Sequence, residues 1–223
     1  MSDQIRRSER TFRSVYLTPG VTAVPAGPYP RRRHDGAPVR CVVVFAHPDP
    51  ASYGAAVGAA VGRGVVAGGG DITEVLDLYG DGYRPSTPLP DRHRSALESA
   101  TMLVVVHPTW WTAQPAILLG WLQRLAAERW PTIATLVEVA THGGPKLGNV
   151  VAGRAGRRTA IHVTRAVSAG GARYRWVPCY GVDRASADRR SAMLGEVESR
   201  LTHITRRLAR SAARPGRDTA LVR

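Results

Sequence analysis

Two adjacent tryptophans stand immediately after an apolar run in the stretch VVVHPTWWTAQPAILLGWLQRL. The run ends at His107-Pro108, Trp110 and Trp111 follow, and apolar residues then recur at helical spacing. Paired indole rings offer large flat faces on which a planar ligand can stack. Pro108 and Pro115 stiffen the turn because each fixes φ and removes a backbone donor. The same two rings could instead cap the hydrophobic core, so the residue types alone leave both interpretations open.

The elements that must position this turn are short apolar runs alternating with segments of helical spacing. Strands are predicted over Cys41–Ala46, Thr101–Val106, Arg157–Thr164 and Arg175–Tyr180, and an alternating pattern predicts one more over Asp71–Asp77. Helices are expected over residues 52–67, 91–100, 114–129 and 185–211, the last with an inner stripe of Leu194, Val197, Leu201, Ile204 and Leu208. Strands that alternate with helices predict an α/β fold, a flavodoxin-like doubly wound five-stranded parallel sheet of order 2-1-3-4-5.

Ligands of such sheets bind beyond the carboxyl ends of the strands, at the point where the strand order reverses. This rule selects three loops of the predicted fold. They follow the first, third and expected fourth strands, over His47–Ser52, His107–Thr112 and Thr164–Gly171.

The charge of the chain lies mainly in its ends. Ten of the fourteen net positive charges fall in residues 1–40 and 181–223. Residues 1–38 are predicted to be a disordered basic Arg/Pro-rich extension, 39–211 the folded domain and 212–223 a basic tail. Basic ends could bind nucleic acid or an anionic membrane surface. No aromatic residues are interleaved with the arginines as stacking platforms, which favours solvated ends over a specific nucleic-acid site.

The two cysteines are too far apart for a metal site and too few for a disulfide scaffold. Cys41 and Cys179 lie in apolar stretches, so we expect buried thiols in a reducing compartment. No zinc-ligand pattern is visible. No apolar run approaches the roughly 18 residues that would span a bilayer. We therefore expect a cytoplasmic protein that is not integral to a membrane.

Three motifs together resemble a known family. AHPDPASY, DLYGDGYRP and HPTWWTAQPAILLGWLQRL follow the first, second and third predicted strands. They look like the bacterial flavodoxin-like NAD(P)H:quinone oxidoreductases, a group with drug-activity modulator-type quinone reductases and the ancillary flavoproteins of glutathione-gated potassium efflux. The resemblance covers roughly residues 40–205, and the Trp-Trp…Pro-Ala-Ile-Leu…Gly-Trp string is its most specific part.

The resemblance implies a flavin, with FAD favoured over FMN, that takes a hydride from NAD(P)H and passes two electrons to a quinone or similar acceptor. It also implies a homodimer, for which Trp121, Trp130 and the THGGPKL loop are interface candidates. By position, the flavin ring would contact Pro108, Thr109, Trp110 and Trp111. The phosphates would be held by His47, Ser52 and Tyr53 at the start of the first helix.

The sequence departs from the family pattern after the expected fourth strand. The family commonly has Thr-Thr-Gly-Gly there, whereas only Thr164 is retained and Arg165 and Ala166 replace glycines. Arg165 could place a cation beside the flavin. Within the phosphate loop, Gly54 stands where the family often has Asn.

The acceptor side of the pocket also differs. His142 occupies the place of a pocket tyrosine, and Tyr174 is a second candidate for that role. Either side chain could donate a hydrogen bond to the developing oxyanion of a quinone, which makes both candidate catalytic residues. The altered loop and the basic ends also suit a flavodoxin-like regulatory or binding module with weak or lost catalysis, which we carry as the alternative function.

Overall fold

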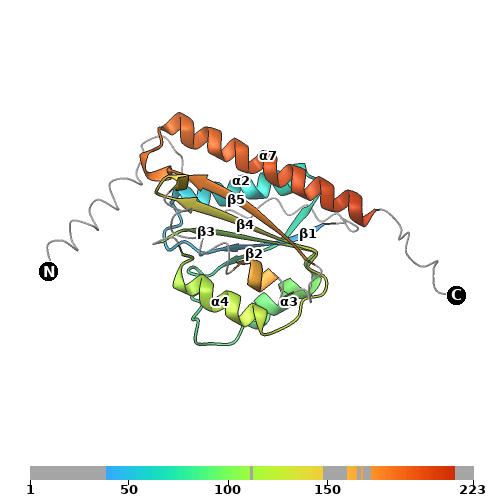
Figure 1. The fold of residues 1–223 in the computed structure, drawn as a ribbon. Coiled ribbons are helices and arrows are strands. Elements are labelled where there is room, and N and C mark those ends of the chain that lie inside the picture. The colour runs from blue at the N-terminus through green and yellow to red at the C-terminus, as the bar shows by residue number, and fades with distance from the viewer. Residues whose placement is uncertain (1–38, 111–112, 148–159, 165–166, 168–171, 214–223) are drawn as a thin grey trace, which may run out of the picture.

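The computed structural model describes residues 39–110, 113–147, 160–164, 167 and 172–213. Five parallel strands form one sheet of order β2-β1-β3-β4-β5 (Figure 1), which confirms the predicted architecture. The expected extension over 1–38 and most of the expected tail lie outside the described residues. The elements are β1 (Arg40–Phe45), α2 (Tyr53–Ala67), β2 (Asp71–Asp77), α3 (Asp91–Ser99), β3 (Met102–Pro108), α4 (Ala116–Ala126), β4 (Thr135–His142), β5 (Arg173–Tyr180), the 3-10 turn η1 (Val182–Arg184) and α7 (Ala187–Ala212).

The fourth strand is not where the sequence pattern placed it. β4 has the sequence TLVEVATH, and the predicted strand over Arg157–Thr164 is wrong, because residues 160–164 are helical. Thr164 donates its hydroxyl proton to Ala160 O at 2.7 Å, the bond to the preceding turn that a helical threonine makes. Ala160, Val163 and Val167 are all buried, so their spacing is that of one helical face. Glu138 interrupts the apolar run of the true strand and concealed it.

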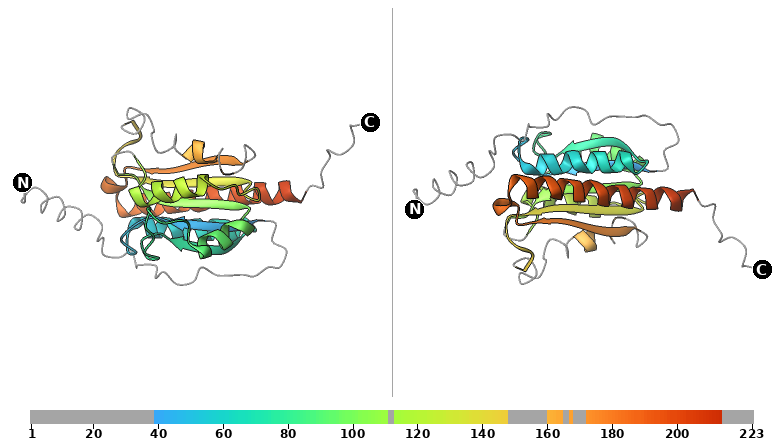
Figure 2. Two further views of the ribbon diagram at one scale, coloured as in Figure 1. Left: turned by 90° about the horizontal axis from the view of Figure 1, so that it is seen from below. Right: turned by 90° about the horizontal axis from the view of Figure 1, so that it is seen from above.

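Helices cover both faces of the sheet. α2 and α7 lie side by side on one face, whereas α3 and α4 cover the other (Figure 2). The core is accordingly split in two. Val43, Val104 and Val137 point toward α2 and α7, and Val44, Val105 and Leu136 point toward α3 and α4. β1, β3 and β4 are therefore buried on both sides, which explains the nearly continuous apolar sequences of β1 and β3.

α2 and α7 touch through glycines. A Cβ built on Gly64 would lie 2.5 Å from Glu198 O, and one on Gly68 would lie 2.5 Å from Thr205 Cβ. Both distances are far below van der Waals contact, so only glycine permits this approach. The glycine-rich sequence that weakens α2 as an isolated helix is thus what brings α7 against it, and the packing offsets the poor helix propensity.

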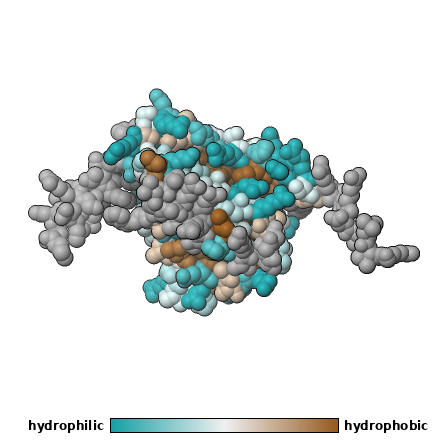
Figure 3. Space-filling model, viewed as in Figure 1, coloured by the Kyte–Doolittle hydropathy of each residue, from teal (hydrophilic) through white to brown (hydrophobic). Residues whose placement is uncertain are grey.

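α7 is amphipathic as its sequence predicts. Val197 and Leu201 are buried, and Leu194, Ile204 and Leu208 pack half-buried against the same core. Hydrophilic residues gather on its outer surface, at the top of the view in Figure 3. Its stripe therefore anchors the last element to the sheet.

Two tryptophans expected at a dimer interface belong to the core instead. Trp121 is fully buried and donates its indole proton to His93 Nδ1 at 3.1 Å. Trp130 is 4% exposed and donates to Leu125 O at 3.1 Å. A side chain buried in its own subunit cannot form an intersubunit contact, so these two assignments are corrected.

Both cysteines have the expected buried position. Cys41 and Cys179 are free thiols within the core on the α2 and α7 side. Among the described helices, none combines the length and the apolar character needed to cross a bilayer.

Candidate functional site

The loops that follow β1 and β3 meet at the carboxyl edge of the sheet. Ala46 N donates to Val106 O at 3.0 Å, so the segments that start at His47 and Thr109 leave the sheet side by side. β4 continues the edge, since Thr109 N donates to Thr141 O at 2.8 Å. The strand order reverses between β1 and β3, which is where doubly wound sheets bind ligands.

The loop after β1 ends in a capped helix. Ser52 is the N-cap of α2, and its Oγ accepts from Ala55 N at 3.3 Å. Its own N–H donates to Asp49 O at 3.2 Å, which folds the loop back on itself. The remaining N–H groups of the first helical turn have no partner within the helix. Together with the helix dipole they form a place suited to an anion.

His47 borders this helix start. The ring is held through one nitrogen, because Nδ1 lies 3.0 Å from Asp49 N and 3.1 Å from Asp49 O. Burial lowers the pKa of His47, although the Asp49 carboxylate opposes the shift. The imidazole is therefore neutral at pH 7 and offers a hydrogen bond rather than a full charge. A Cβ on Gly54 would lie 3.3 Å from Ser52 Oγ and 3.4 Å from the His47 ring, so a side chain there would contact both.

The turn after β3 is closed by two backbone hydrogen bonds. Trp110 and Ala113 each donate an N–H to the carbonyl of the other at 3.0 Å. Trp110 and Thr109 are half-buried, and Pro108 is buried. This pairing holds the Trp110 backbone rigidly beside the end of β3. Trp111 lies outside the described residues.

His142 ends β4 and fixes this turn from the side. Thr109 Oγ1 donates its proton to Thr141 O at 3.0 Å. It lies 2.9 Å from His142 Nδ1 and accepts the proton of that nitrogen. The His142 ring is stacked on Tyr180, with centroids 4.7 Å apart and planes 25° apart. Burial and, secondly, the charge of His107 lower the pKa of His142 to about 4. The ring is thus a neutral donor toward Thr109.

Two glycines extend the edge after β4. A Cβ on Gly143 would overlap the Asp183 carboxylate of the η1 turn, so a side chain there would require Asp183 to move. A Cβ on Gly144 would meet nothing within 4 Å, which leaves its surroundings open. Gly144 O accepts from Gly181 N at 2.9 Å and ties this loop to the end of β5.

A buried polar network lies directly beneath the Trp110 turn. Glu138 in the middle of β4 is 2% exposed. Its Oε1 accepts from His107 Nε2 at 2.8 Å and from Gln114 Nε2 at 3.0 Å, and its Oε2 accepts from Tyr174 Oη at 2.6 Å. A carboxyl group that accepts three hydrogen bonds is in its ionised form.

The same network fixes the charge of His107. Its Nε2 faces the Glu138 carboxylate, and its Nδ1 lies 2.9 Å from Pro108 O, which can only accept. Both ring nitrogens therefore carry protons. A buried imidazolium–carboxylate pair results, one residue before the turn that carries Trp110. Sequence reasoning missed it, and its signal was an acidic residue inside an apolar strand.

A family model described as the flavodoxin-like fold matches residues 40–187. The chain belongs to this flavodoxin-like family. The match confirms the resemblance at the level of the family, and it covers every strand of the sheet. A search of functionally curated proteins found no match.

Solved structures similar to this flavodoxin-like protein share its fold at low identity. An NAD(P)H:quinone oxidoreductase from Methanothermobacter marburgensis is 20% identical, with a TM-score of 0.62 over 74% of this chain and 96% of its own. An FMN-dependent NADH-azoreductase from Bacillus anthracis, in complex with FMN, is 13% identical, with a TM-score of 0.56 over 75% and 99% of the two chains.

Within this flavodoxin-like fold, the true end of β4 changes the comparison with the family pattern. The residues there are Thr141-His142-Gly143-Gly144, so the glycines expected after the fourth strand are present. Thr164 instead lies in the crossover helix, whose Val167 O accepts from Trp130 N before β4 begins. Thr164 is therefore directed away from the site. Arg165, like Ala166, lies outside the described residues.

Two predicted tyrosines are also placed elsewhere. Tyr53 donates its hydroxyl proton to Arg190 O at 2.9 Å on α7, and does not face the helix start. The Tyr174 backbone lies near the beginning of β5, and its hydroxyl donates to Glu138 Oε2 at 2.6 Å, so it belongs to the buried network beneath the turn and not to the surface that a ligand would contact. The structure therefore brings together His47, Ser52, Pro108, Thr109, Trp110 and His142, and separates them from Tyr53, Thr164 and Tyr174.

Proposed function

We propose that the protein is a flavin-dependent NAD(P)H oxidoreductase that passes two electrons to a small acceptor such as a quinone. One observation carries the proposal. The anion-binding start of α2 and the rigid Trp110 turn lie next to each other at the switch point of the sheet, where one ligand with a phosphate and a planar ring would contact both. The names of the structural neighbours support the same reaction class.

Each end of the site has residues suited to part of a flavin. His47, Ser52 and the first N–H groups of α2 would hold a phosphate. Pro108, Thr109, Trp110 and Trp111 would lie along the ring, and the open surroundings of Gly144 leave room beside it. When bound, the flavin supplies the two-electron redox chemistry, and the protein supplies position and electrostatics.

His142 serves in this proposal as a positioning residue for Thr109. It is 4% exposed, and its Nδ1 is used by the Thr109 hydroxyl. Beneath the turn, His107 is paired with the Glu138 carboxylate at 2.8 Å, so the network holds the turn by hydrogen bonds and adds no net charge below a ligand. These residues orient the turn.

We propose FMN as the cofactor instead of the FAD that the resemblance suggested. The azoreductase among the structural neighbours is named as FMN-dependent. The same proposal includes a quinone-like acceptor and NADPH or NADH as the hydride donor. It also includes a homodimer with the THGGPKL loop near its interface. Sedimentation analysis of the flavin-loaded protein tests the dimer.

The visible absorption spectrum during anaerobic addition of NADPH tests the function. We expect a flavin band that bleaches on NADPH and returns when a quinone is added. A protein that stays colourless and binds neither FMN nor FAD would exclude the oxidoreductase. Flavin binding without turnover would favour the regulatory alternative.

Two variants link the result to the site. Trp110→Ala should weaken FMN binding about tenfold or more, the range of a lost stacking contact. Ser52→Ala should also weaken it. Ser186→Ala is the matched control, because Ser186 caps α7 through Arg189 N at 3.2 Å but lies past β5. Equal losses in the two serine variants would show that capping alone, not the phosphate site, explains the effect.

A further inference from the structure

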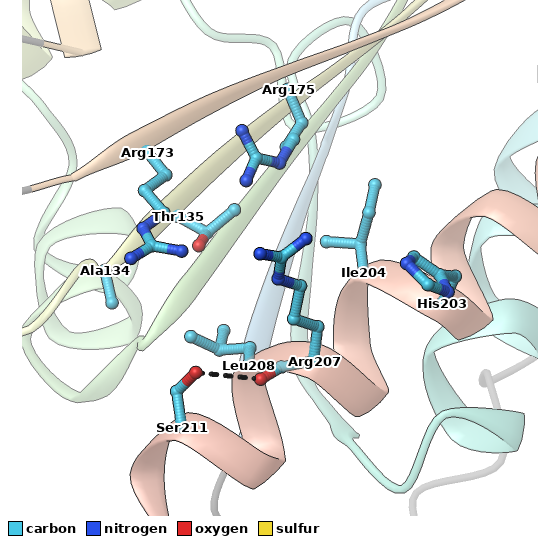
Figure 4. A pocket seen from close by; sticks show the side chains of 9 residues that line it. All are labelled: Ala134, Thr135, Arg173, Arg175, His203, Ile204, Arg207, Leu208 and Ser211. Carbon is cyan, nitrogen blue, oxygen red and sulfur yellow. Dashed lines mark hydrogen bonds between the residues drawn. The ribbon is translucent and has the colours of Figure 1, made fainter.

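A groove lies at the opposite, amino edge of the sheet, between α7 and the first residues of β4 and β5. Its volume is about 260 Å³, and Thr135, Arg173 and Arg175 line it from the strands (Figure 4). Ile204 and Arg207 line it from α7. This groove shares no residue with the site at the carboxyl edge.

Three guanidinium groups point into this space. Arg173 and Arg175 extend from β5, and Arg207 extends toward them from α7 (Figure 4). Among the described residues, no carboxylate lies within ion-pair distance of any of the three. Other arginines of the same fold are paired: Arg63 with Glu198 at 2.8 Å, and Arg189 with Glu196 at 3.2 Å. Within the part of the chain that the structure describes, the groove thus gathers three arginines that have no acidic partner.

Like charges that converge in a concave surface repel one another and focus a positive potential on the space between them. An anion bound there would relieve the repulsion. Guanidinium groups also match phosphate oxygens in a fork with two parallel hydrogen bonds. Three forks from two elements suit a ligand with more than one phosphate better than a single small anion.

The floor of the groove is different in character. Ile204 and Leu208 are half-buried and pack against the core, and the Thr135 side chain is buried. A volume of about 260 Å³ is below the range of drug-sized ligand pockets, roughly 300–1,000 Å³, which suits a compact ligand and not a duplex.

We propose that this groove binds a small molecule bearing two or more phosphate groups. The proposal is independent of the flavin function, because the two sites lie at opposite ends of the strands. The apolar floor would contact any uncharged part of such a ligand.

Calorimetric titration of the full chain with inorganic pyrophosphate at low ionic strength tests the proposal. Arg175→Gln and Arg207→Gln should each weaken binding about tenfold or more, the range for a lost charged hydrogen bond. Arg206→Gln is the matched control. It removes the same charge from the same helix, but Arg206 faces α2, where its Nη2 donates to Ala67 O at 3.2 Å. This variant should bind within about twofold of the parent protein, since only screened long-range charge is lost.

Flavin binding and NADPH oxidation should be unchanged in all three variants, which separates this groove from the proposed active site. An equal loss in the Arg206 variant would overturn the proposal, because the effect would then reflect diffuse charge. Absence of pyrophosphate binding would do the same. Binding of duplex DNA that pyrophosphate does not displace would assign the basic surface to nucleic acid instead.

Discussion

Replacing Glu138 by leucine tests the buried network beneath the Trp110 turn. The carboxylate accepts three hydrogen bonds at 2.6–3.0 Å in a position that is 2% exposed. Leucine removes every acceptor and leaves the His107 charge buried without its partner. Breaking such a pair on one side costs about 3–5 kcal/mol. For a chain of this size that loss lowers the melting temperature by roughly 6–20 °C, at about 2–4 °C per kcal/mol.

The free energy of unfolding from urea titration measures the effect. Glu98→Gln, an exposed change on α3, is the control and should stay within about 0.5 kcal/mol of the parent. The double variant His107→Leu/Glu138→Leu should be more stable than Glu138→Leu alone, because removing both charges abolishes the unpaired one.

Two outcomes would refute the reasoning. A loss below about 1 kcal/mol for Glu138→Leu would mean that no charge depends on this carboxylate. Additive losses in the double variant would mean that His107 and Glu138 do not interact, whatever their distance.

Further expectations concern packing, acid stability and thiol reactivity. Gly120→Ala should lower the free energy of unfolding by about 1–3 kcal/mol, because the added Cβ would overlap a proline of the facing loop. Gly195→Ala, at an open position on α7, should raise it by about 0.5–1 kcal/mol. Equal urea midpoints for the two variants would contradict this. Because the pKa of His142 falls from 6.5 to about 4, the unfolded chain binds that proton more tightly, so stability should decrease by up to about 3 kcal/mol as pH falls from about 6.5 to about 4. His142→Asn should flatten this profile, and an unchanged slope would assign it to other groups. Cys41 and Cys179 should react with a thiol reagent only after unfolding, since both are buried and the pKa of Cys179 is raised to about 11; reaction at the native rate of an exposed thiol would contradict the packing.

Much of the fold was predictable because β1 and β3 are nearly pure apolar runs and β2 alternates between apolar and polar residues. Asp71–Asp77 has the predicted ends, and the helix expected from Ser52 begins at Tyr53 with Ser52 as its cap. β4 failed for a physical reason. A glutamate in a strand normally marks a solvated face, and only the side chains of His107, Gln114 and Tyr174, from other elements, make its burial tolerable.

The site was predictable where chain neighbours define it. The loop after β1 fixes His47 near Ser52, and the turn after β3 fixes Thr109 beside Trp110. The structure places both pairs at the carboxyl edge of the sheet. The expected position of Tyr174 was wrong because it depended on which strand is the fourth. A segment of the crossover helix had been predicted as that strand. The groove at the amino edge had no local signal, since Arg173 and Arg207 meet only through the packing of α7.

The glycine contact between α2 and α7 controls a surface on the far side of α7. A methyl group on Gly64 would meet the backbone of Glu198, which has no rotamer to escape into, so the whole of α7 would have to translate. The direction away from α2 leads toward β5, where Arg207 would close on Arg173 and Arg175. The absence of a side chain at Gly64 therefore sets the width of the arginine groove, although the two lie on opposite sides of α7, about one helix diameter (10 Å) apart. A side chain at position 64 should therefore narrow the arginine groove as well as loosen the contact between α2 and α7.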